Sequence, residues 1–323
     1  MVTARRGQSR EASRSLETRL GTRLPGLRRR TLERLAELDV RPSRELGQNF
    51  LVDERYLEVV EQAAELSSAD VVLEVGGGLG ALSIRLAPLV AHLHAVEVDH
   101  RLARSLGEDL APFTNVTLLE ADAVRLDFPA LEPSPGKLVA NLPYGIAATA
   151  LLKAIEELPD ATLFVGMVQR EVGERLVAPP GSRAYGVTSV LAQLACEVRV
   201  HPRVPRAAFY PTPNVDSAIV VLRRGRPTPS PATRAFVRAA FAHRRKTIAG
   251  SLALVAANPS AGKLAVAGAG TRRDAGADDL RRRVRAALAE LGHPHDARAE
   301  RLWPAELERL ALAVEGTVEA RPR

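Results

Sequence analysis

The sequence contains a single cysteine, Cys196, so the chain can form no internal disulfide and no thiolate metal cluster. It has no apolar run of about 18 residues or more, and arginines stand at its N-terminus where a signal peptide would have an apolar core. These absences exclude a secreted disulfide scaffold, and we expect a cytoplasmic protein that neither spans nor binds a membrane. Aromatic residues make up only 4% of the chain, so an aromatic side chain in a turn is a candidate for function.

Charge is distributed unevenly along the chain. Residues 1–45 carry 12 arginines and 6 acids, residues 46–222 carry a net charge of −9, and residues 223–323 carry 20 basic and 10 acidic residues. Clustered arginine and lysine displace counterions from phosphates. An acidic body with basic ends therefore favours a polyanion partner such as RNA, although charge alone equally fits solvated helix faces.

The middle of the chain alternates short apolar runs with longer helical patterns, which predicts an α/β fold with helices on both faces of the sheet. Seven runs have the length and composition of strands: 71–75, 93–98, 116–119, 138–140, 163–168, 194–201 and 218–222.

Three divisions of the chain are expected. Residues 1–40 form a basic, mobile arm, within which Leu32, Leu35 and Leu38 recur at helical spacing. Residues 41–224 form the sheet domain, and three prolines in 223–231 end it. Residues 225–323 form a smaller, all-helical domain that binds RNA or the ribosome, with helical patterns over 232–256, 278–291 and 304–315.

A glycine loop, residues 76–80, directly follows the first predicted strand and allows a ligand to approach the backbone closely. Two cofactors fit the pattern. Gly76, Gly78 and Ala81, with Glu97 as the later acid, satisfy the dinucleotide fingerprint of nicotinamide enzymes. S-adenosylmethionine fits as well, because Glu97 ends the second strand, where the ribose needs a carboxylate, and Asp122 follows the third, where the adenine needs an acceptor.

The fourth strand ends in Asn141-Leu142-Pro143-Tyr144. This motif suits methylation of an exocyclic amine, which is a poor nucleophile until acceptors hold its hydrogens. The Asn141 side-chain oxygen and the Leu142 carbonyl supply two acceptors, Pro143 fixes the turn, and Tyr144 offers a face on which an extruded base can stack.

With these motifs the sequence resembles the ribosomal RNA adenine N6-dimethyltransferases, specifically the bacterial small-subunit enzymes of the KsgA type. The resemblance covers about 270 residues and rests on several motifs in the family's order: 44–53, 76–80, Glu97, Asp122, 141–144, 169–186, 208–217 and 241–247.

The resemblance implies S-adenosylmethionine as cofactor and a Rossmann-like methyltransferase sheet. It implies that Asn49 and Leu51 contact the cofactor, together with Gly76, Gly78, Glu97, Asp122 and Asn141. It also implies that Tyr144 and Phe209 sandwich the target base, although Phe209 also fits a core position at a strand start. Arg244, Arg245 and Lys246, expected on one helix, would dock on RNA phosphates.

The implied reaction is N6-dimethylation of two adjacent adenosines in the 3′-terminal hairpin of small-subunit ribosomal RNA, within a particle that is still maturing. Two alternatives stay open: a large-subunit enzyme of the macrolide-resistance type, and a non-catalytic assembly factor. Gly77, Gly145 and Thr212 depart from the family pattern, which leaves the turnover rate open. We expect no metal site, and a monomer as the default.

Overall fold

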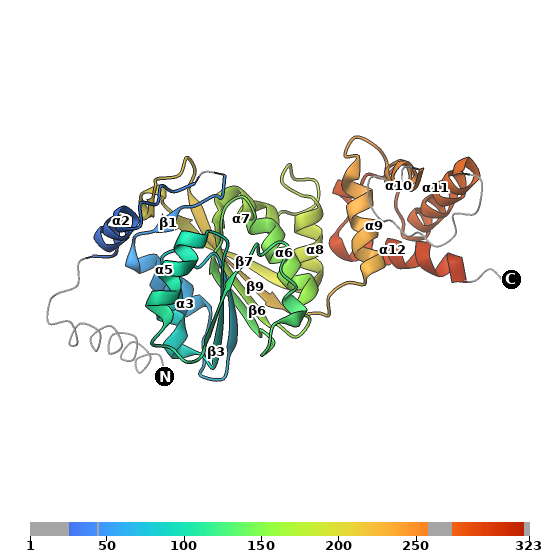
Figure 1. Cartoon of the computed structure of the whole chain (residues 1–323). Helices are drawn as coiled ribbons and strands as arrows, with labels where there is room; N and C mark the ends of the chain where they lie inside the picture. Colours follow the sequence, from blue (N-terminus) through green and yellow to red (C-terminus); the bar gives the residue numbers. More distant parts are fainter. Residues whose placement is uncertain (1–25, 44, 258–272, 320–323) are drawn as a thin grey trace. The chain divides into compact units, whose positions relative to one another are not determined.

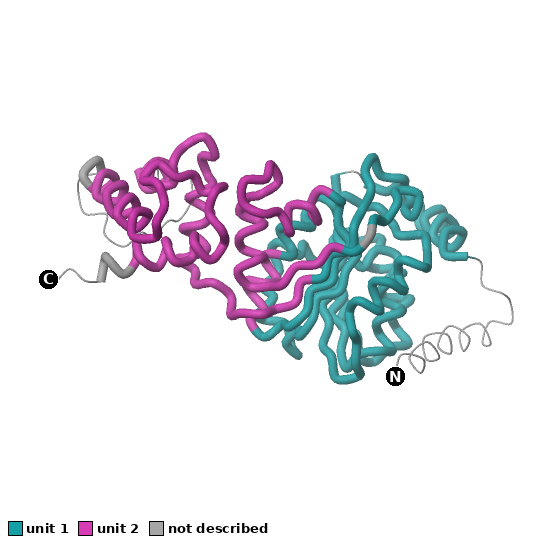
Figure 2. The backbone as a smooth tube through the Cα atoms, turned by 180° about the vertical axis from the view of Figure 1, so that it is seen from behind, with its two compact units in different colours: residues 1–151, 160–170, 201–221 teal, residues 152–159, 171–200, 222–323 magenta. Residues whose placement is uncertain are grey.

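The computed structural model describes residues 26–43, 45–257 and 273–319 (Figure 1). They form two compact units, each made of several stretches of chain (Figure 2). The first unit contains residues 1–151, 160–170 and 201–221; the second contains residues 152–159, 171–200 and 222–323. The units thus interleave along the sequence, and stretches 152–159 and 171–200 of the expected sheet domain group with the C-terminal helices.

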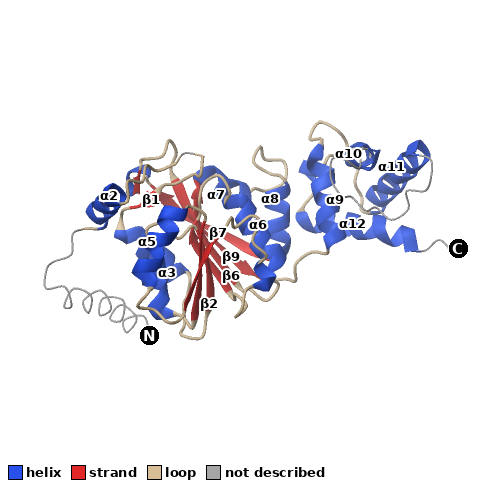
Figure 3. Ribbon diagram, in the orientation of Figure 1, coloured by secondary structure: helices blue, strands red, loops and turns tan. Residues whose placement is uncertain are grey.

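A seven-stranded sheet with flanking helices confirms the predicted α/β fold (Figure 3). Its strands are β2 (Val71–Val75), β3 (His92–Glu97), β4 (Val116–Glu120), β5 (Lys137–Asn141), β6 (Leu163–Gln169), β7 (Cys196–Val204) and β9 (Ser217–Arg224). All seven match predicted strands within a few residues. The largest differences are in β7: residues 194 and 195 belong to the preceding helix α8 (Val187–Ala195), and the strand ends at Val204, three residues beyond the predicted end.

The strand order is β4-β3-β2-β5-β6-β9-β7, and neighbours from β4 to β6 run parallel. The chain moves outward from β2 to β4 and then returns to pair β5 with β2. In an open parallel sheet, ligands bind beyond the carboxyl ends of the strands at this reversal. The ends of β2, β3 and β5 therefore mark the expected site.

Two short strands were not predicted. β1 (Phe50–Leu51) pairs antiparallel with β8 (Phe209–Tyr210), so that Leu51 lies opposite Phe209. A two-residue strand has no periodicity to detect. The pairing joins the leading segment, residues 45–53, to a motif more than 150 positions further along the chain.

Helices of the first unit are α2 (Leu27–Glu37), α3 (Glu54–Ala63), α4 (Ser83–Leu86), α5 (His100–Leu110) and the start of α6 (Ala147–Glu157). Asp53 and Asp99 cap α3 and α5 by accepting backbone N–H bonds. Helix α2 lies inside the expected mobile arm and differs from that expectation, because Leu35 is buried in a cluster with Leu102. Residues 1–25 lie outside the described residues.

The second unit contains α7 (Arg170–Leu176), α8, α9 (Pro231–Ala242), α10 (Ile248–Ala257), α11 (Arg273–Glu290) and α12 (Pro304–Glu319). The single helix expected over 232–256 is wrong: it is interrupted at residues 243–247. Arg244, Arg245 and Lys246 therefore lie in the turn between α9 and α10 and not on one helix. No helix among the described residues is long and apolar enough to cross a bilayer.

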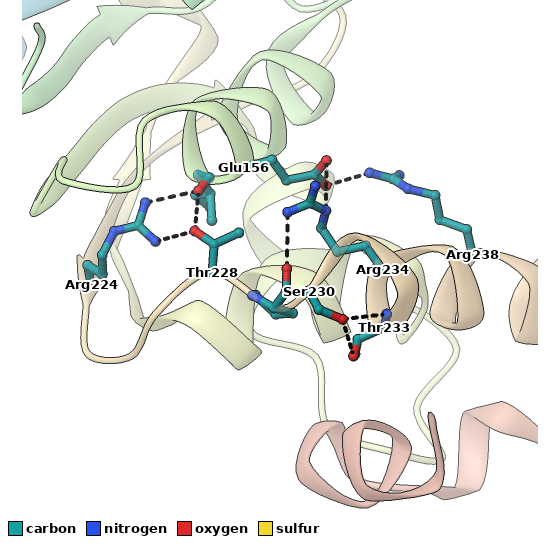
Figure 4. A network of polar contacts seen from close by, with 9 residues as sticks. Glu156, Arg224, Thr228, Ser230, Thr233, Arg234 and Arg238 are labelled. Atoms are coloured by element: carbon teal, nitrogen blue, oxygen red, sulfur yellow. Dashed lines mark hydrogen bonds and ion pairs between the residues drawn. The ribbon is translucent and has the colours of Figure 1, made fainter. Parts of the chain in front are cut away.

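A polar network fastens the start of α9 to the end of α6 (Figure 4). Glu156 forms ion pairs with Arg234 and Arg238 on α9. Arg224 donates to the carbonyls of Ile155 and Leu158 at 3.0 and 2.9 Å, which satisfies oxygens left open at a helix end. Residues 223–231, where the sheet domain was expected to end, are thus hydrogen-bonded to the end of α6 through Arg224.

Candidate active site

A cavity of about 220 Å³ lies in the first unit, at the carboxyl ends of β2, β3 and β5. It is lined by residues of five stretches of chain, 45–50, 75–78 without Gly77, 96–98, 121–123 and 141–146, and by Leu102. The predicted residues Asn49, Gly76, Gly78, Glu97, Asp122 and Asn141–Tyr144 all line it. The structure thus brings together most of the residues that the sequence motifs singled out.

The glycine loop requires glycine at two positions. Gly76 and Gly78 have φ angles of 83° and 57°, which disfavour any residue with a side chain. A Cβ atom on Gly76 would lie 2.8 Å from the Pro143 ring, and one on Gly78 would lie 3.3 Å from the Phe50 ring. The loop therefore packs directly against Pro143 and against the leading segment.

Glu97 lines the cavity and accepts hydrogen bonds from three backbone N–H groups. One carboxylate oxygen accepts the Gly78 N–H at 2.8 Å, and the other accepts the N–H groups of Val98 and Asp99 at 2.9 Å. Burial raises the pKa of Glu97, while these three backbone N–H bonds lower it. The carboxylate is thus fixed at the end of β3, where Oε2, which accepts only the Gly78 N–H, retains a lone pair for a ribose hydroxyl.

We expect Glu97→Gln to weaken cofactor binding. An amide has one acceptor oxygen, so it cannot accept on both sides, and an NH₂ group would face a backbone N–H. We expect the dissociation constant for S-adenosylmethionine to rise about tenfold or more, for a lost charge-assisted bond of about 1.5–3 kcal/mol. Calorimetric titration measures it. Glu120→Gln, at an exposed carboxylate one strand away, is the control, and equal affinities for both variants would contradict the role of Glu97.

Asp122 lies in the loop after β4 and lines the cavity. Its Oδ1 accepts the Val124 N–H at 2.9 Å, and its Oδ2 lies 3.4 Å from Arg125 Nε. These bonds fix the carboxylate while its side chain stays 42% exposed. An acceptor for an amino group is therefore available at this position.

The Asn141 motif is held on several sides. Asn141 Nδ2 donates to the Asn49 carbonyl at 3.2 Å, so its Oδ1 is the atom left to accept from a ligand. Leu142 N donates to the Met167 carbonyl at 3.1 Å, which anchors the turn to β6. The Tyr144 hydroxyl lies 2.6 Å from Ser217 Oγ, and burial raises the pKa of this phenol.

Two predicted residues do not line the cavity. Leu51 is 3% exposed, and Phe209 is fully buried; both belong to the core beneath the site. The Phe209 and Tyr144 rings meet edge to face, with centroids 6.3 Å apart and planes at 64°. A base sandwiched between them would require Phe209 to leave its position, so that role stays a prediction. The cofactor contact of Leu51 stays a prediction as well; in the structure its backbone pairs with Phe209.

The sequence motifs did not predict the contacts by which Gly47 and Gln48 hold the leading segment in place. Gly47 has a φ of 64°, and a Cβ atom there would lie 2.9 Å from Tyr144 N and 3.0 Å from Gly145 N. Gln48 accepts from Ser43 N at 2.7 Å and donates to Asp99 at 3.3 Å. The signal was the glycine itself, which precedes Gln48 in the leading segment and permits backbone to lie on backbone.

The pKa of Glu74, which lies just before the glycine loop, is strongly raised. It is 1% exposed, and burial raises its pKa to about 8, opposed by the nearby Ser83 hydroxyl and assisted by the Glu97 charge. Its Oε2 has no hydrogen-bond partner within the described structure. The carboxyl group is therefore neutral at pH 7 in the folded protein.

We expect the free energy of unfolding to fall as pH rises from about 4.5 to about 8, because folded Glu74 keeps a proton that the unfolded chain releases. The slope from this group reaches about 1.4 kcal/mol per pH unit. Glu74→Gln removes it, so urea unfolding at pH 5.5 and 7.5 should shift in favour of the variant by about 2 kcal/mol. If the free energy of unfolding changed with pH equally in the wild type and in Glu74→Gln, Glu74 would not be neutral. Glu58→Gln, at an exposed position, serves as control.

The sequence profile of the family described as ribosomal RNA adenine dimethylase matches residues 41–267 of this chain. A ribosomal RNA small subunit methyltransferase A of Thermobifida fusca is 42% identical over 245 residues, covering 73% of this chain and 85% of the relative. The chain belongs to the ribosomal RNA adenine dimethylase family. The resemblance inferred from the motifs is thereby confirmed.

Solved structures agree with this fold. A dimethyladenosine transferase from Plasmodium falciparum superimposes with a TM-score of 0.62 at 24% identity, covering 80% of this chain and 94% of that one. The 23S rRNA methyltransferase ErmE superimposes with a TM-score of 0.56 at 27% identity, covering 82% of this chain and 99% of that one. The Rossmann-like methyltransferase fold is confirmed.

Family membership decides between the two cofactors that the glycine loop allows. The chain is a ribosomal RNA adenine dimethyltransferase, and its methyl donor is S-adenosylmethionine rather than a nicotinamide dinucleotide. The cavity fits that cofactor. Its glycines leave room at the backbone, and Glu97 at the end of β3 and Asp122 after β4 contribute carboxylates to its lining.

Proposed function

We propose that the enzyme dimethylates N6 of two adjacent adenosines in the 3′-terminal hairpin of small-subunit ribosomal RNA, within a maturing 30S particle. The observation that carries this proposal is the Asn141 motif in the cofactor cavity, with a free side-chain acceptor beside the glycine loop. The protein acts as a monomer in the cytoplasm and uses no metal.

The reaction is a direct displacement. When bound in this cavity, S-adenosylmethionine would supply an electrophilic methyl group to the adenine amine and would leave as the neutral thioether. Asn141 Oδ1 and the Leu142 carbonyl accept the two amine hydrogens and hold the nitrogen lone pair toward the methyl group. The attacking nitrogen then loses one proton to solvent, so the protein needs no strong base.

Tyr144 holds the base. It lines the cavity, and its hydroxyl is fixed by Ser217, so its ring position is set before a base arrives. Extruding an adenine from a hairpin costs a few kcal/mol, which stacking on an aromatic face offsets. The second methylation uses the same acceptor geometry with one amine hydrogen remaining.

Sequence similarity favours the small subunit as target. The Thermobifida fusca small-subunit enzyme is 42% identical, whereas the large-subunit enzyme ErmE is 27% identical. A role in particle maturation follows from a target inside an assembling subunit. The non-catalytic alternative is less favoured, because the carboxylates and the Asn141 motif are all present at the cavity.

Transfer of labelled methyl groups tests the target. Unmethylated small-subunit particles and large-subunit RNA are incubated separately with the enzyme and labelled S-adenosylmethionine. We expect label in the small-subunit sample alone. Label in the large-subunit RNA would move the target to the other subunit, and no label in either sample would favour the non-catalytic alternative.

A further inference from the structure

Trp303 is the only tryptophan of the chain, and its side chain lies in solvent, with the residue 57% exposed. It directly precedes α12, whose first residue is Pro304. This is the N-cap position, where a serine, threonine, aspartate or asparagine normally accepts a hydrogen bond from the first turn of the helix. An indole has no acceptor. The Trp303 side chain therefore cannot cap the first turn of α12.

The rest of the cap is intact. Glu306 accepts the Trp303 backbone N–H at 2.7 Å, which is the half of a capping box that the third helical residue provides. Pro304 at the first helical position fits a helix start. Only the side chain of residue 303 breaks the local rule, and an exposed residue that does so without a structural gain indicates function.

Three segments of the second unit meet beside Trp303, and Tyr185 joins them. The Tyr185 hydroxyl donates to the Leu302 carbonyl at 2.8 Å, and Arg244 donates to the Tyr185 carbonyl at 3.2 Å. Gly181 N also donates to the Glu300 carbonyl at 2.7 Å. Tyr185 is fully buried, so the junction of residues 181–185, 244–248 and 297–303 is a packed one.

The junction carries a positive charge on its exposed side chains. Its basic residues, all exposed, are Arg183, Arg244, Arg245, Lys246, Arg298 and Arg301. Glu300 is the only acid within the three segments, and it lies 4.0 Å from Arg298. We call the exposed surface of these three segments the basic face; its net positive charge attracts a polyanion.

We propose that this face binds ribosomal RNA, with Trp303 stacking on an unpaired base while the surrounding arginines and Lys246 contact phosphates. The inference rests on the proposed function, which supplies RNA as the partner, and adds a stacking residue far along the chain from the Asn141 motif. Stacking platforms within basic grooves are the usual means of holding single-stranded nucleic acid.

RNA suits this face better than a protein partner. Protein interfaces have an apolar centre, and Trp303 is the only large apolar side chain that is exposed in these three fully described segments. One exposed aromatic ring among six cations matches a base flanked by phosphates.

The single tryptophan allows a direct test with the full-length protein. The probe is a protein-free transcript of small-subunit ribosomal RNA, and the signals are tryptophan fluorescence and filter binding. We expect saturating RNA to quench the fluorescence. We expect Trp303→Ser, which restores the cap, to weaken RNA binding about tenfold without lowering the midpoint of thermal unfolding, and Trp303→Phe to bind as the wild type does.

Leu312→Ser is the control, because Leu312 is 53% exposed on α12 outside the three segments; its RNA affinity should equal that of the wild type. Unchanged fluorescence at saturating RNA, or a Trp303→Ser variant that binds RNA normally, would overturn the proposal. Because binding is measured without methylation, an enzyme inactive on small-subunit RNA would refute the proposed function and leave this test intact.

Discussion

Asn141→Ala is expected to lower kcat for methyl transfer about a thousandfold while the affinity for S-adenosylmethionine changes by no more than about threefold. Asn141 Oδ1 is the acceptor that orients the amine, and its loss leaves the nitrogen lone pair delocalised into the adenine ring. The cofactor pocket keeps Glu97, Asp122 and both glycines, so binding persists. Single-turnover transfer and calorimetric titration measure the two quantities separately.

Asn115→Ala is the matched control for this experiment. Asn115 is also half-buried, and its Nδ2 donates to the carbonyls of Ala87 and Val90 at 2.8 and 2.9 Å, away from the cavity lining. Its replacement should lower the free energy of unfolding by about 1–3 kcal/mol and leave kcat unchanged. An Asn141→Ala variant that turns over at the wild-type rate would show that another group orients the amine.

Gly47→Ala is expected to have the second largest effect, because the leading segment can no longer seat on the Asn141 motif. Its Cβ would lie 2.9 Å from Tyr144 N, and its φ of 64° already disfavours alanine. The segment would move away and break the bond from Asn141 to the Asn49 carbonyl. We expect affinity for S-adenosylmethionine to fall about tenfold and kcat about a hundredfold.

Gly145→Ala isolates the cause. Gly145 lines the same cavity, yet a Cβ atom there would have nothing within 4 Å. We expect this variant to match the wild type in affinity and turnover. If Gly47→Ala and Gly145→Ala behaved alike, the backbone contact between the leading segment and Tyr144 would have no part in catalysis.

The sheet and most of the cavity could be predicted from the sequence because both follow short-range patterns. Parallel strands such as β2, with four of five residues buried, read as apolar runs, interrupted in β2 only by Glu74. The loops that follow them carry Gly76, Glu97, Asp122 and Asn141, and the strand order brings those loops to one edge.

The features that could not be predicted from the sequence depend on contacts between segments far apart in the chain. The break at residues 243–247 interrupts a pattern that is compatible with one helix, and all but the last of these residues are exposed. The burial of Phe209 follows from its pairing with Leu51, which no local signal reveals. The contact of Gly47 with Tyr144 joins segments about 100 residues apart in the same way.

Nucleoside analysis of the methylated RNA tests the central claim most directly. Small-subunit particles lacking the modification are treated with enzyme and S-adenosylmethionine, and the hairpin at the 3′ end of their RNA is isolated, digested and analysed by mass spectrometry. The account predicts N6,N6-dimethyladenosine at two adjacent positions with the wild type and unmodified adenosine with Asn141→Ala. Methyl groups on another atom or base, or unmodified hairpins with the wild-type enzyme, would contradict it.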